Sequence, residues 1–571
     1  MQRLRVLLAN LLWFCYAAIR ARKWRRAASD VVTTQYAVLR RILTANNDCT
    51  FAQQHHFSTI NSVEAFQGSV PIRSYEEMHP YIQRMVEGEE RILLSEQIQR
   101  FALTSGSTQA SKLVPYTKAL INEFQEGIDP WVYYLFRSQP ALLLGKTYWS
   151  VTPVGDRTSY TPGGIPVGFD DEQLYFSSLT RWVLGTVMIS PSQLAQLRDM
   201  ETFRYVTLRL LLQEGTLTWI SIWNPSFLTL LLEPLSAWFL RLTDDLRQGS
   251  LSVADQIDEP VRSAIIAVCR CDPVRARKLK ALFADRQGRD LIEPGETERT
   301  FYEEIWPALR MISCWAHGNA TYALPRLQAY FPHVTIQPKG LLATEAFISF
   351  PFKDDLSAIS LLSHFFEFEE TNTSTPVIKL AHELERGRCY AVIVTTGGGL
   401  YRYRLNDSIE VVDFYKQCPL IRFIGRQAKV VDICGEKLHE DFVRQTVTAT
   451  LQKYALEPLF WLLAPEGPSG AQPFYTLFIQ LAVHVAPETN QLALIAHTID
   501  ERLQESYHYN YARRLGQLGT CRLFLIAPSS DAFHIYLKVC ADQGQRLGDI
   551  KTVALHAYRA WSQCFPGTFI Q

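Results

Sequence analysis

Residues 103–117 have the sequence LTSGSTQASKLVPYT, and the rest of the chain is organised around this stretch. Apolar residues stand before it, and Leu113 and Val114 follow its small-residue centre, which predicts a strand, a tight loop and a second strand. Five consecutive loop residues carry a hydroxyl or are glycine, namely Thr104, Ser105, Gly106, Ser107 and Thr108. Backbone N–H groups and hydroxyls are accessible in such a loop, and Lys112 adds a cation at its end, so the loop could wrap a phosphate.

An ordinary surface turn has the same composition, so this stretch alone does not establish a phosphate site. A P-loop is excluded, because its signature is G-x-x-x-x-G-K-[ST]. In this chain Lys112 is followed by Leu113, and the second glycine of the signature is absent. The choice between a surface turn and a nucleotide loop therefore depends on the other parts of the chain.

The composition is that of a large globular protein without a basic or a disulfide-rich character. The chain has 571 residues, of which 47% are hydrophobic, and this length predicts two or three domains. Lys and Arg total 57, as do Asp and Glu, so no basic excess indicates a nucleic-acid partner. The 11 cysteines include no C-x-x-C pair, which favours reduced thiols and argues against a structural zinc site. We expect a cytoplasmic protein that acts as a monomer.

Two apolar runs could be mistaken for membrane segments. Residues 6–19 have basic residues on both sides, but the run is shorter than the ~20 residues that span a bilayer, and no convincing cleavage site follows it. A docked amphipathic helix is our interpretation, with weak peripheral membrane contact as the alternative. Residues 217–240 are interrupted by Asn224-Pro225 and Glu233-Pro234, which predicts two short buried helices. We expect no integral membrane segment.

The order of helical and strand patterns predicts an α/β fold with two domains. Residues 1–100 have mainly helical patterns, 119–136 predict a further helix, and strands are expected at 141–145 and 148–151. Helices dominate residues 190–330, and residues 331–426 alternate short helices with apolar strands. We place the large α/β domain at residues 1–426. Residues 427–571 follow a β-α-β-β-α-β order, which predicts a smaller α+β domain of ferredoxin-like type.

Two further stretches of the large domain carry residues suited to nucleotide chemistry. Thr344 and Glu345 supply a hydroxyl and a carboxylate, which would suit a phosphate oxygen and Mg²⁺. Over residues 401–404 two tyrosines alternate with two arginines, so one face of a strand could be aromatic and the other cationic. Asp407 ends this stretch and could accept hydrogen bonds from a ribose diol. Each pattern alone also fits an ordinary surface, or an edge strand with snorkelling arginines.

Two more residues are notable by their position. Arg426 ends the stretch Arg422-Phe423-Ile424-Gly425-Arg426 at the expected domain boundary, where a hinge would lie. Lys551 follows a glycine-flanked loop of the second domain. An ordinary strand end and a solvated lysine remain the simplest interpretations of these two stretches when each is taken by itself.

Together these stretches resemble the adenylate-forming enzymes, and among them the auxin-responsive (Gretchen Hagen) family of acyl acid amido synthetases, in its microbial branch. The resemblance extends over nearly the whole chain. Its motifs occur in matching order and spacing, and they are Arg22-Lys23-Trp24-Arg25, Val70-Pro71-Ile72, residues 103–117, residues 161–168, Ala343-Thr344-Glu345, residues 401–407 and residues 422–426.

The resemblance implies a two-step reaction on small molecules. A carboxylic acid would attack the α-phosphate of ATP·Mg²⁺ to give an acyl-adenylate and pyrophosphate. An amine, typically an amino acid, would then attack the acyl carbon and expel AMP. ATP and Mg²⁺ are the cofactors, and the acid and the amine are the partners, that this resemblance implies.

The resemblance also implies roles for single residues. The five loop residues and Lys112 would bind the phosphates, Thr344 would touch the α-phosphate, and Glu345 would hold the metal. Lys551 would belong to a mobile second domain and stabilise the pentavalent phosphate during adenylation, which fits the reliance of such transfers on cations and positioning. Three further nucleotide contacts would come from Tyr403 near the nucleotide, Asp407 on the ribose hydroxyls, and Arg426 at the hinge and ribose.

Three departures from the family pattern bear on these roles. Gln109-Ala110 stands in the loop where relatives often have glycine. Asn406 replaces the glycine common before the ribose aspartate, but asparagine tolerates left-handed backbone geometry. The segment around Lys551 lacks the proline and arginine that plant members place after it, which makes this assignment the least direct.

The acyl pocket is expected between the helices of residues 120–240 and the turn at residues 315–319, with Trp315, His317 and Gly318 as lining residues. His317 could be a base or a structural histidine, and the second is favoured. Two other functions stay open: an adenylate-forming ligase with a thiol acceptor, either coenzyme A or a carrier protein, and a non-catalytic nucleotide-binding homologue. The joint presence of Lys112, Glu345 and Asp407 argues against a non-catalytic protein.

Overall fold

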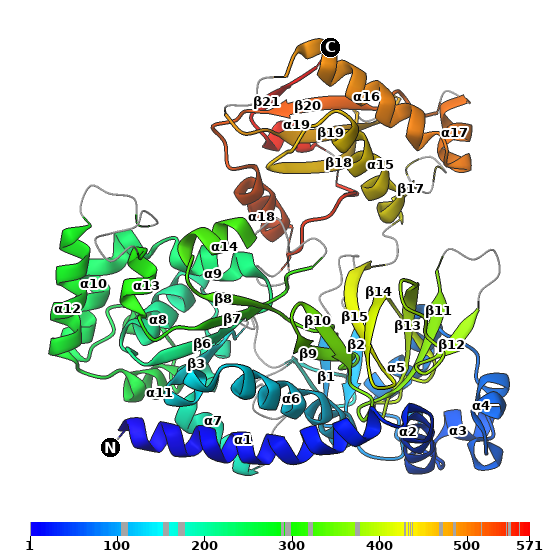
Figure 1. Cartoon of the computed structure of the whole chain (residues 1–571), viewed down its shortest axis with the longest axis horizontal. Coiled ribbons are helices and arrows are strands. Elements are labelled where there is room, and N and C mark those ends of the chain that lie inside the picture. Colours follow the sequence, from blue (N-terminus) through cyan, green and yellow to red (C-terminus); the bar gives the residue numbers. More distant parts are fainter. Residues whose placement is uncertain are drawn as a thin grey trace. The chain divides into compact units, whose positions relative to one another are not determined.

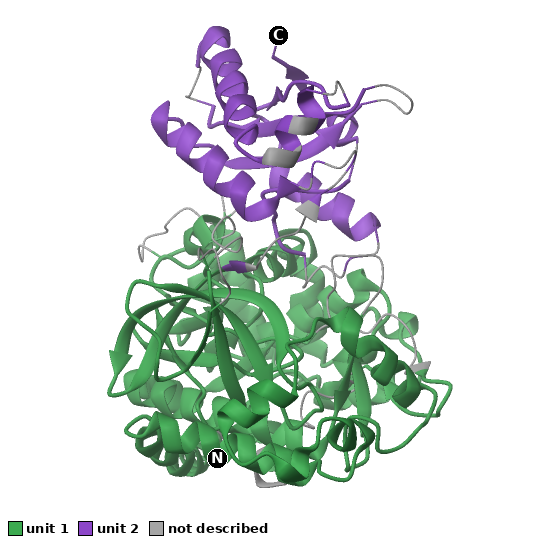
Figure 2. Cartoon of the chain, turned by 90° about the vertical axis from the view of Figure 1, so that its right-hand side faces the viewer, with its two compact units in different colours: residues 1–317, 323–424 green, residues 318–322, 425–571 purple. Residues whose placement is uncertain are grey.

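The computed structural model divides into two compact units (Figure 2). Unit 1 comprises residues 1–317 and 323–424, and unit 2 comprises residues 318–322 and 425–571. Both units combine helices with sheets, as the α/β prediction requires. The structure describes residues 2–103, 112–151, 159–168, 178–286, 291, 299–317, 324–371, 377–426, 430–431, 433, 436, 438–467, 472–483, 487–514, 517–543, 545, 550–558 and 560–570.

Unit 1 begins with five α-helices, in agreement with the helical patterns of the first hundred residues. They are α1 (Gln2–Ala27), α2 (Val31–Ala45), α3 (Thr50–Gln54), α4 (Val63–Ser69) and α5 (Tyr75–Val86). The start of α5 is fixed by a capping box, in which Ser74 and Glu77 each accept the other's backbone N–H. Because of this cap, Tyr75 and Glu76 stand in the first turn of α5.

A small sheet carries the two strands expected around the hydroxyl-rich loop. Its order is β2-β1-β5-β4, with β1 (Arg100–Leu103), β2 (Leu113–Tyr116), β4 (Ser159–Tyr160) and β5 (Pro166–Val167). Helix α6 (Lys118–Ser138) follows β2 and packs against both α1 and β9 (Figure 1). The strand expected at 141–145 is wrong: Pro140–Leu144 is the 3₁₀-helix η2, which begins at a proline that has no N–H to donate to a ladder.

A parallel sheet forms the second layer of unit 1. Its order is β3-β6-β7-β8, with β3 (Lys146–Trp149), β6 (Leu217–Ser221), β7 (Met311–Cys314) and β8 (Thr335–Pro338). Parallel strands need long crossovers, and these contain α7 (Ser178–Val187), α8 (Met200–Leu212), α9 (Pro225–Leu232), α10 (Leu235–Gln248), α11 (Val261–Val268), α12 (Pro273–Asp285), α13 (Phe301–Ile305) and α14 (Leu324–Tyr330).

The apolar run at 217–240 is therefore only partly the pair of buried helices that we expected. Its first five residues form the fully buried strand β6 and the remainder enters α9 and α10. A short apolar run is compatible with either a buried strand or a buried helix, and the parallel neighbours of β6 decide between them.

The third and largest sheet of unit 1 has seven strands in the order β12-β11-β13-β14-β15-β10-β9. Antiparallel pairing is seen at β9/β10, β10/β15, β11/β12, β11/β13 and β13/β14. The strands are β9 (Ser349–Lys353), β10 (Leu356–Ile359), β11 (Phe365–Glu370), β12 (Ile378–Leu380), β13 (Cys389–Thr395), β14 (Tyr403–Tyr415) and β15 (Cys418–Arg426). Burial alternates along the first half of β14, so every second residue faces the core.

Unit 2 is an α+β unit whose main sheet has the order β18-β19-β20-β21. The strands are β18 (Phe460–Glu466), β19 (Phe474–Gln480), β20 (Arg522–Ile526) and β21 (Gly567–Phe569), and the helices are α15 (Glu440–Lys453), α16 (Thr489–Leu503), α17 (Tyr507–Arg514), α18 (Ala532–Asp542) and α19 (Trp561–Cys564).

The main sheet of unit 2 differs from the expected ferredoxin-like order. The strand expected near 429–433 is the short β16 (Val430–Val431), which pairs with β17 (Leu438–His439) outside the main sheet. Its place is taken by β21, which pairs antiparallel with β20. The C-terminal strand was not recognised because Gly567–Phe569 is too short to give a periodic signal.

Candidate active site

The strands on either side of the hydroxyl-rich loop pair as the sequence predicts. Leu103 lies opposite Leu113 in the antiparallel β1/β2 ladder. The loop itself, with Thr104, Ser105, Gly106, Ser107 and Thr108, lies outside the described residues. The described chain resumes at Lys112, one residue before β2.

The loop exit is held by the first turn of α5. The Tyr75 hydroxyl accepts the Leu113 N–H at 2.8 Å, and the Lys112 Nζ lies 4.8 Å from the centroid of the Tyr75 ring. Lys112 also lies 3.6 Å from the Glu76 carboxylate, whose side chain is 74% exposed. Because this carboxylate is exposed to solvent, the ion pair holds the lysine only weakly.

Thr344 and Glu345 form the tip of a tight turn. Ala343 and Ala346 exchange backbone hydrogen bonds of 3.0 and 3.3 Å across it, and the Tyr116 hydroxyl donates to the Thr344 carbonyl at 2.6 Å. Glu345 is buried, and its negative charge contributes to the raised pKa of Tyr75, although burial of the phenol is the main cause. The turn, β2 and α5 thus bring Glu345 and Lys112 to the same tyrosine.

Arg402 and Arg404 do not form the cationic strand face that we expected. Arg402 is buried, with Nε 2.9 Å from the Glu367 carboxylate and Nη1 2.7 Å from the Val70 carbonyl. Arg404 lies 2.9 Å from Glu369. The edge-strand alternative is wrong as well, because β14 lies between β13 and β15. Both guanidinium groups therefore stabilise the sheet and are engaged with carboxylates.

A β-bulge positions Asp407. Arg404 lies opposite Ile393 and Ser408 opposite Ala391, so three residues of β14 face the single Val392 of β13. Within the bulge Asn406 has φ of 62°, the left-handed conformation that a glycine would adopt freely. This finding accounts for asparagine at a position where the family commonly has glycine. Asp407 is buried at 8% exposure, and Tyr403 is buried at the start of the strand.

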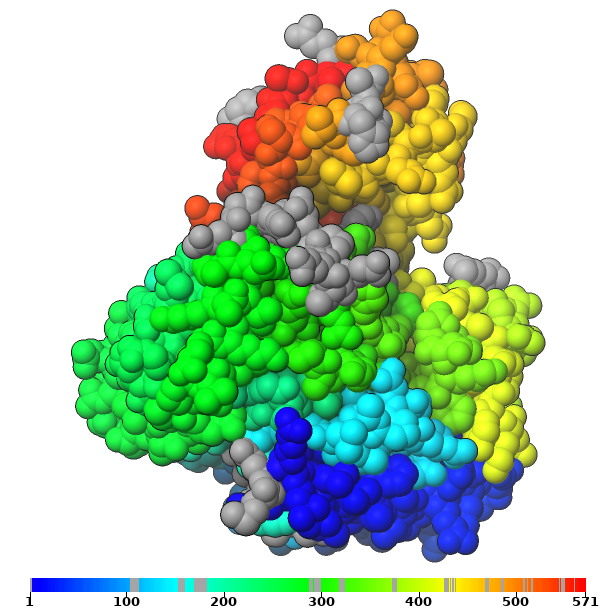
Figure 3. Space-filling view, turned by 60° about the vertical axis from the view of Figure 1, so that its left-hand side comes forward, coloured from blue at the N-terminus to red at the C-terminus, as the bar shows by residue number. Residues whose placement is uncertain are grey.

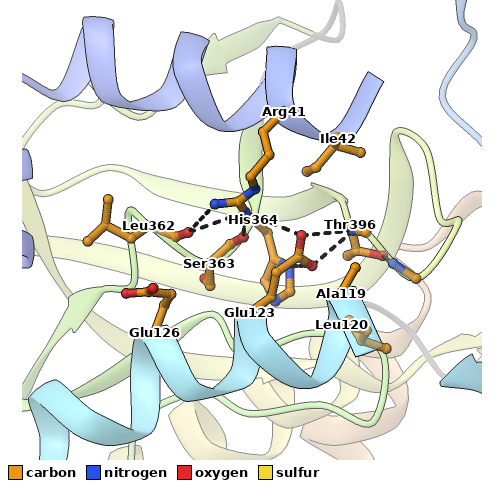
Figure 4. Close-up of polar contacts among 12 residues, drawn as sticks. Arg41, Ile42, Ala119, Leu120, Glu123, Glu126, Leu362, Ser363, His364 and Thr396 are labelled. Atoms are coloured by element: carbon orange, nitrogen blue, oxygen red, sulfur yellow. Dashed lines mark hydrogen bonds and ion pairs between the residues drawn. The ribbon is translucent and has the colours of Figure 1, made fainter. Parts of the chain in front are cut away.

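A buried carboxylate that sequence reasoning missed connects two of these segments (Figure 4). Glu123 of α6 accepts the Gly397 N–H at 2.9 Å, and its Oε2 lies 2.9 Å from Nδ1 of the fully buried His364. The other ring nitrogen, Nε2, accepts the Phe347 N–H at 2.9 Å, so the ring proton lies on Nδ1 and is donated to Glu123. Through these hydrogen bonds, Glu123 links the turn before β14, which contains Gly397, to Phe347, which follows the Thr344–Glu345 turn.

The same carboxylate borders a groove of about 250 Å³. Arg41 of α2 reaches Glu123 at 3.3 Å and the Ser363 carbonyl at 2.9 Å (Figure 4). None of the residues expected to bind nucleotide or acid lines this groove. The contacts among its polar residues hold α2, α6 and the large sheet together, and we assign them a structural role.

The expected acyl-pocket residues lie at the carboxyl edge of the parallel sheet. Trp315 follows β7, and its ring centroid is 5.8 Å from that of Trp223, which follows β6. Lys339 follows β8 and lies 4.1 Å from the centroid of the Trp223 ring. The carboxyl edge of parallel strands is where ligands bind in open α/β sheets. Gly318 lies outside the described residues.

His317 is half-buried near this edge. Burial lowers the pKa of His317, the neighbouring Asp355 opposes the shift, and Arg422 reinforces it. Asp355 and Arg422 form a salt bridge of 2.7 Å, which leaves little net charge to favour the imidazolium. The neutral imidazole is therefore the favoured form at neutral pH.

Arg426 and Lys551 are the two remaining expected site residues; the sequence predicts the first at the domain boundary and the second in the smaller domain. The backbone of Arg426 ends β15. Lys551 of unit 2 is exposed, and its carbonyl oxygen accepts a hydrogen bond of 2.8 Å from the Tyr536 hydroxyl. The Tyr536 ring is stacked on Trp561, so a buried aromatic cluster of unit 2 fixes the backbone at Lys551.

Family models match this chain along most of its length. The GH3 family N-terminal domain matches residues 20–336, the central domain residues 358–426, and the C-terminal domain residues 441–559. The chain belongs to the GH3 family. The resemblance inferred from the sequence is thereby confirmed. In this GH3 protein, residues 103–117 lie in the N-terminal family domain and residues 401–407 in the central one, whereas Thr344 and Glu345 lie between the two matched ranges.

Relatives of this GH3 protein are amido synthetases. It is 22% identical to the putative indole-3-acetic acid-amido synthetase GH3.9 of Arabidopsis thaliana over 92% of each chain. It is 23% identical to the indole-3-acetic acid-amido synthetase GH3.15 of the same plant, over 92% of this chain and 90% of that one.

Solved structures agree in fold. The GH3.15 acyl acid amido synthetase has a TM-score of 0.74 at 20% identity, covering 95% of this chain and 94% of that chain. The structure titled AtGH3.15 acyl acid amido synthetase in complex with 2,4-DB has a TM-score of 0.76 at 21% identity, covering 94% of each. The homologues and structural neighbours of this GH3 protein are thus acyl acid amido synthetases, which are ligases.

The hydrogen bond between Glu123 and Gly397 was missed by sequence reasoning, and only a weak sequence signal indicates it. Glu123 is a carboxylate on the buried, otherwise mainly apolar side of α6, and three consecutive glycines stand at 397–399. A Cβ on Gly397 would lie 2.7 Å from the Glu123 carboxylate, so glycine is needed there for the close approach. The glycine run could have indicated a buried partner, but not which carboxylate supplies it.

Proposed function

We propose that this GH3 protein joins a carboxylic acid to an amine, an amino acid by analogy with its relatives, through an acyl-adenylate made from ATP. The observation that carries the proposal is that Lys112 and Glu345 both act on Tyr75, in a chain whose residues 20–336, 358–426 and 441–559 match the three GH3 family domains. Lys112 is a cation at the exit of the expected phosphate loop, and Glu345 is a buried carboxylate whose charge acts on the same tyrosine.

In the adenylation step, a carboxylate oxygen of the acid forms a bond to the α-phosphorus as the bond to pyrophosphate breaks. Negative charge is concentrated on the phosphate oxygens, so donors fixed before the reaction supply most of the catalysis. The Thr344 hydroxyl and the loop residues 104–108 would donate to these oxygens. Lys112 would bind the departing pyrophosphate, and Lys551 would neutralise the pentavalent phosphate.

The nucleotide's other contacts would come from the large sheet. Asp407, turned by the bulge in β14, would accept hydrogen bonds from the ribose hydroxyls. Tyr403 would lie near the nucleotide, and Arg426 would act at the hinge and reach the ribose. The left-handed Asn406 supports the role of Asp407, because it sets the direction in which β14 leaves the bulge.

Glu345 fits a magnesium ion that is shared with phosphates. Mg²⁺ is bound in such enzymes by one or two carboxylates together with substrate phosphate oxygens, and a dedicated protein cage is not required. In agreement, the described residues hold no group of three or more His, Cys, Asp or Glu side chains that could bind a metal alone. When bound, Mg²⁺ would neutralise phosphate charge, and Glu345 would fix its position from the rigid turn.

In the second step, the amine nitrogen forms a bond to the acyl carbon, and the bond from that carbon to the AMP phosphate oxygen breaks. The acid would lie at the carboxyl edge of the parallel sheet, where Trp223 and Trp315 offer apolar faces and Lys339 a positive charge. His317 and Gly318 belong to the same expected pocket. The cysteines of the described residues are free thiols, which supports a cytoplasmic location, and we expect a monomer.

An ATP–pyrophosphate exchange screen tests the proposal. Aromatic, fatty and indolic acids are offered one at a time, and at least one should stimulate exchange. The active acid is then incubated with ATP and either a mixture of amino acids or coenzyme A, and the products are identified by mass spectrometry. An amide with stoichiometric AMP supports the proposal.

Other outcomes of the same screen assign the other functions. A coenzyme A thioester with no amide would make the chain a ligase with a thiol acceptor. Exchange that no acid stimulates, in a preparation that binds ATP by calorimetry, would indicate a non-catalytic nucleotide-binding protein. Glu345→Gln serves as the inactive enzyme, and Glu410→Gln on β14 serves as its matched control.

A further inference from the structure

Helix α1 is apolar on its outer side as well as on its inner side. The inner side buries Val6, Ala9, Trp13, Ala17 and Trp24 in the core of unit 1. The outer side exposes Leu4, Leu8, Leu11, Leu12 and Ile19 by 60, 52, 38, 47 and 60%, and we call these five residues the α1 outer face. They recur at spacings of three and four residues along most of this stretch, so they lie on one side of the helix.

A surface helix of a globular protein normally turns a polar side to water. The α1 outer face therefore requires an explanation, because exposed apolar patches mark sites of interaction. Two elements that pack against α1 also carry an exposed large apolar side chain: Leu144 of η2 is 60% exposed and Trp182 of α7 is 55% exposed. In the space-filling view the N-terminal helix lies open on the surface of unit 1 (Figure 3).

The charges of α1 are all of one sign. The helix contains no Asp or Glu, whereas the whole chain has a net charge of zero. Two of its cations are engaged with the protein: Arg20 lies 3.0 Å from Asp129, and Arg25 lies over the Tyr133 ring. The exposed cations stand at the two ends of the α1 outer face and are Arg3, Arg5, Arg22, Lys23 and Arg26.

We propose that the α1 outer face docks this protein on the surface of an anionic phospholipid bilayer. The leucines and Ile19 enter the boundary between headgroups and acyl chains, and the terminal cations contact lipid phosphates. This combination of an apolar side with flanking Arg and Lys is the one that interfacial helices use. Each such cation gains free energy near the negatively charged cytoplasmic leaflet.

The helix lies along the bilayer and does not cross it. Among the described residues, Arg3–Ala27 is the one helix long and apolar enough to span a membrane by length and composition. Spanning would withdraw Trp13 and Trp24 from the core, where Trp24 donates a hydrogen bond of 2.9 Å to the Ile359 carbonyl. Only the outer half of the helix is free to enter lipid.

A second copy of the chain is a poorer occupant than a bilayer. Two α1 helices that pack antiparallel about a twofold axis bring Arg3 and Arg5 of one copy toward Arg22 and Arg26 of the other. These contacts are repulsive and no carboxylate of α1 relieves them. Lipid phosphates complement both ends at once. The proposal concerns location and is independent of the acid–amine ligase activity.

Vesicle co-sedimentation of the full-length protein tests the docking. Wild type is mixed with vesicles of phosphatidylcholine alone, and of phosphatidylcholine with phosphatidylserine. We expect binding to the anionic vesicles that weakens with added salt. Leu8→Glu/Leu12→Glu should reduce the partition coefficient at least about tenfold, because two apolar anchors are replaced by charges that anionic lipid repels. Arg22→Glu/Arg26→Glu should bring binding down to the level seen with phosphatidylcholine.

The matched control is Leu240→Glu/Val274→Glu, which changes two exposed apolar residues on α10 and α12 of the same unit. It should bind like wild type. Melting temperature and pyrophosphate exchange, measured on every variant, report folding and activity separately from docking. Binding of Leu8→Glu/Leu12→Glu equal to wild type would overturn the proposal, as would wild type that stays in the supernatant with anionic vesicles. A wild-type dimer by light scattering that this variant dissociates, without vesicle binding, would assign the face to self-association.

Discussion

The two sides of unit 1 that would meet the substrates are held in different ways. On the nucleotide side, backbone segments are fixed by buried polar groups: Glu123 binds Gly397, His364 binds Phe347, and Arg402 joins Glu367 to the end of α4. On the acid side, half-buried rings and Lys339 stand at the edge of the parallel sheet. A fixed backbone suits a nucleotide that is common to all reactions, whereas side chains at a sheet edge can be exchanged to suit different acids.

The largest effect is expected from the turn that carries the metal ligand. Glu345→Gln keeps the shape of the turn but removes the charge that would hold Mg²⁺, so acid-dependent exchange should fall by about 100-fold or more. The measurement is initial exchange rate against Mg²⁺ concentration. The control Glu410→Gln should retain wild-type rates. Near-normal exchange in Glu345→Gln would show that another group binds the metal.

Lys551 of unit 2 should contribute to the adenylation step and not to amide formation. Lys551→Ala should slow adenylation by about 100-fold, because a cation on the pentavalent phosphate is lost. Amide formation from a chemically prepared acyl-adenylate should change little, since that phosphate no longer reacts. Single-turnover rates of the two steps distinguish them. Equal losses in both steps would contradict the role, and Lys538→Ala on α18 provides a control for loss of a lysine in unit 2.

Loss of the buried hydrogen bonds from Gly397 and His364 to Glu123 should lower both the stability of the protein and its affinity for ATP. Glu123→Ala leaves the Gly397 N–H and the His364 Nδ1–H unsatisfied, which should lower the free energy of unfolding by about 3 kcal/mol. It should also raise the KM for ATP more than it lowers kcat, because both segments are displaced. Urea unfolding and exchange kinetics are the measurements.

Glu123→Gln separates positioning from simple loss of stability. Its amide oxygen can still accept both hydrogen bonds, so the KM for ATP should return close to the wild-type value. If the glutamine variant raises the KM for ATP as much as the alanine variant does, the hydrogen bonds to Gly397 and His364 are not what matters.

On the acid side a substitution should change selectivity and leave nucleotide binding intact. Trp315→Ala removes one ring of the Trp223–Trp315 pair and should raise the KM for a bulky acid about tenfold, with the KM for ATP unchanged. The acid screen is repeated with this variant and with Trp238→Ala, a tryptophan of α10. A parallel rise in the KM for ATP would remove the distinction between the two sides.

The smallest expected effect is the pH dependence contributed by His317. Burial lowers its pKa in the folded chain, so below the ordinary histidine value of about 6.5 the unfolded chain binds more protons. Stability therefore falls as the pH drops from 7.5 toward 5.5, and this contribution is absent above that range. His317→Gln should flatten the slope of melting temperature against pH. An unchanged slope would show that other groups cause it.

Local patterns were sufficient for the parts of the site that lie close together in sequence. The pairing of β1 with β2 and the left-handed tolerance of Asn406 each depend on a few neighbouring residues. The arginines of residues 402–404 were misassigned, because alternation shows which side of a strand a residue takes and not whether that side meets solvent or a carboxylate. Arg402, just before the central strand β14, is buried against Glu367, and Arg404 within β14 pairs with Glu369 of β11.

The sequence by itself determined the family and the α/β class, because these follow from short motifs and hydrophobic periodicity, and it predicts the segments that would bind the nucleotide. Only the tertiary structure decided that Glu123 and His364, 241 residues apart, share one hydrogen bond, and that α1 leaves a row of leucines in solvent. Both facts depend on which surfaces are covered by distant parts of the chain. Burial is a property of the packed molecule, and no local pattern of residues specifies it.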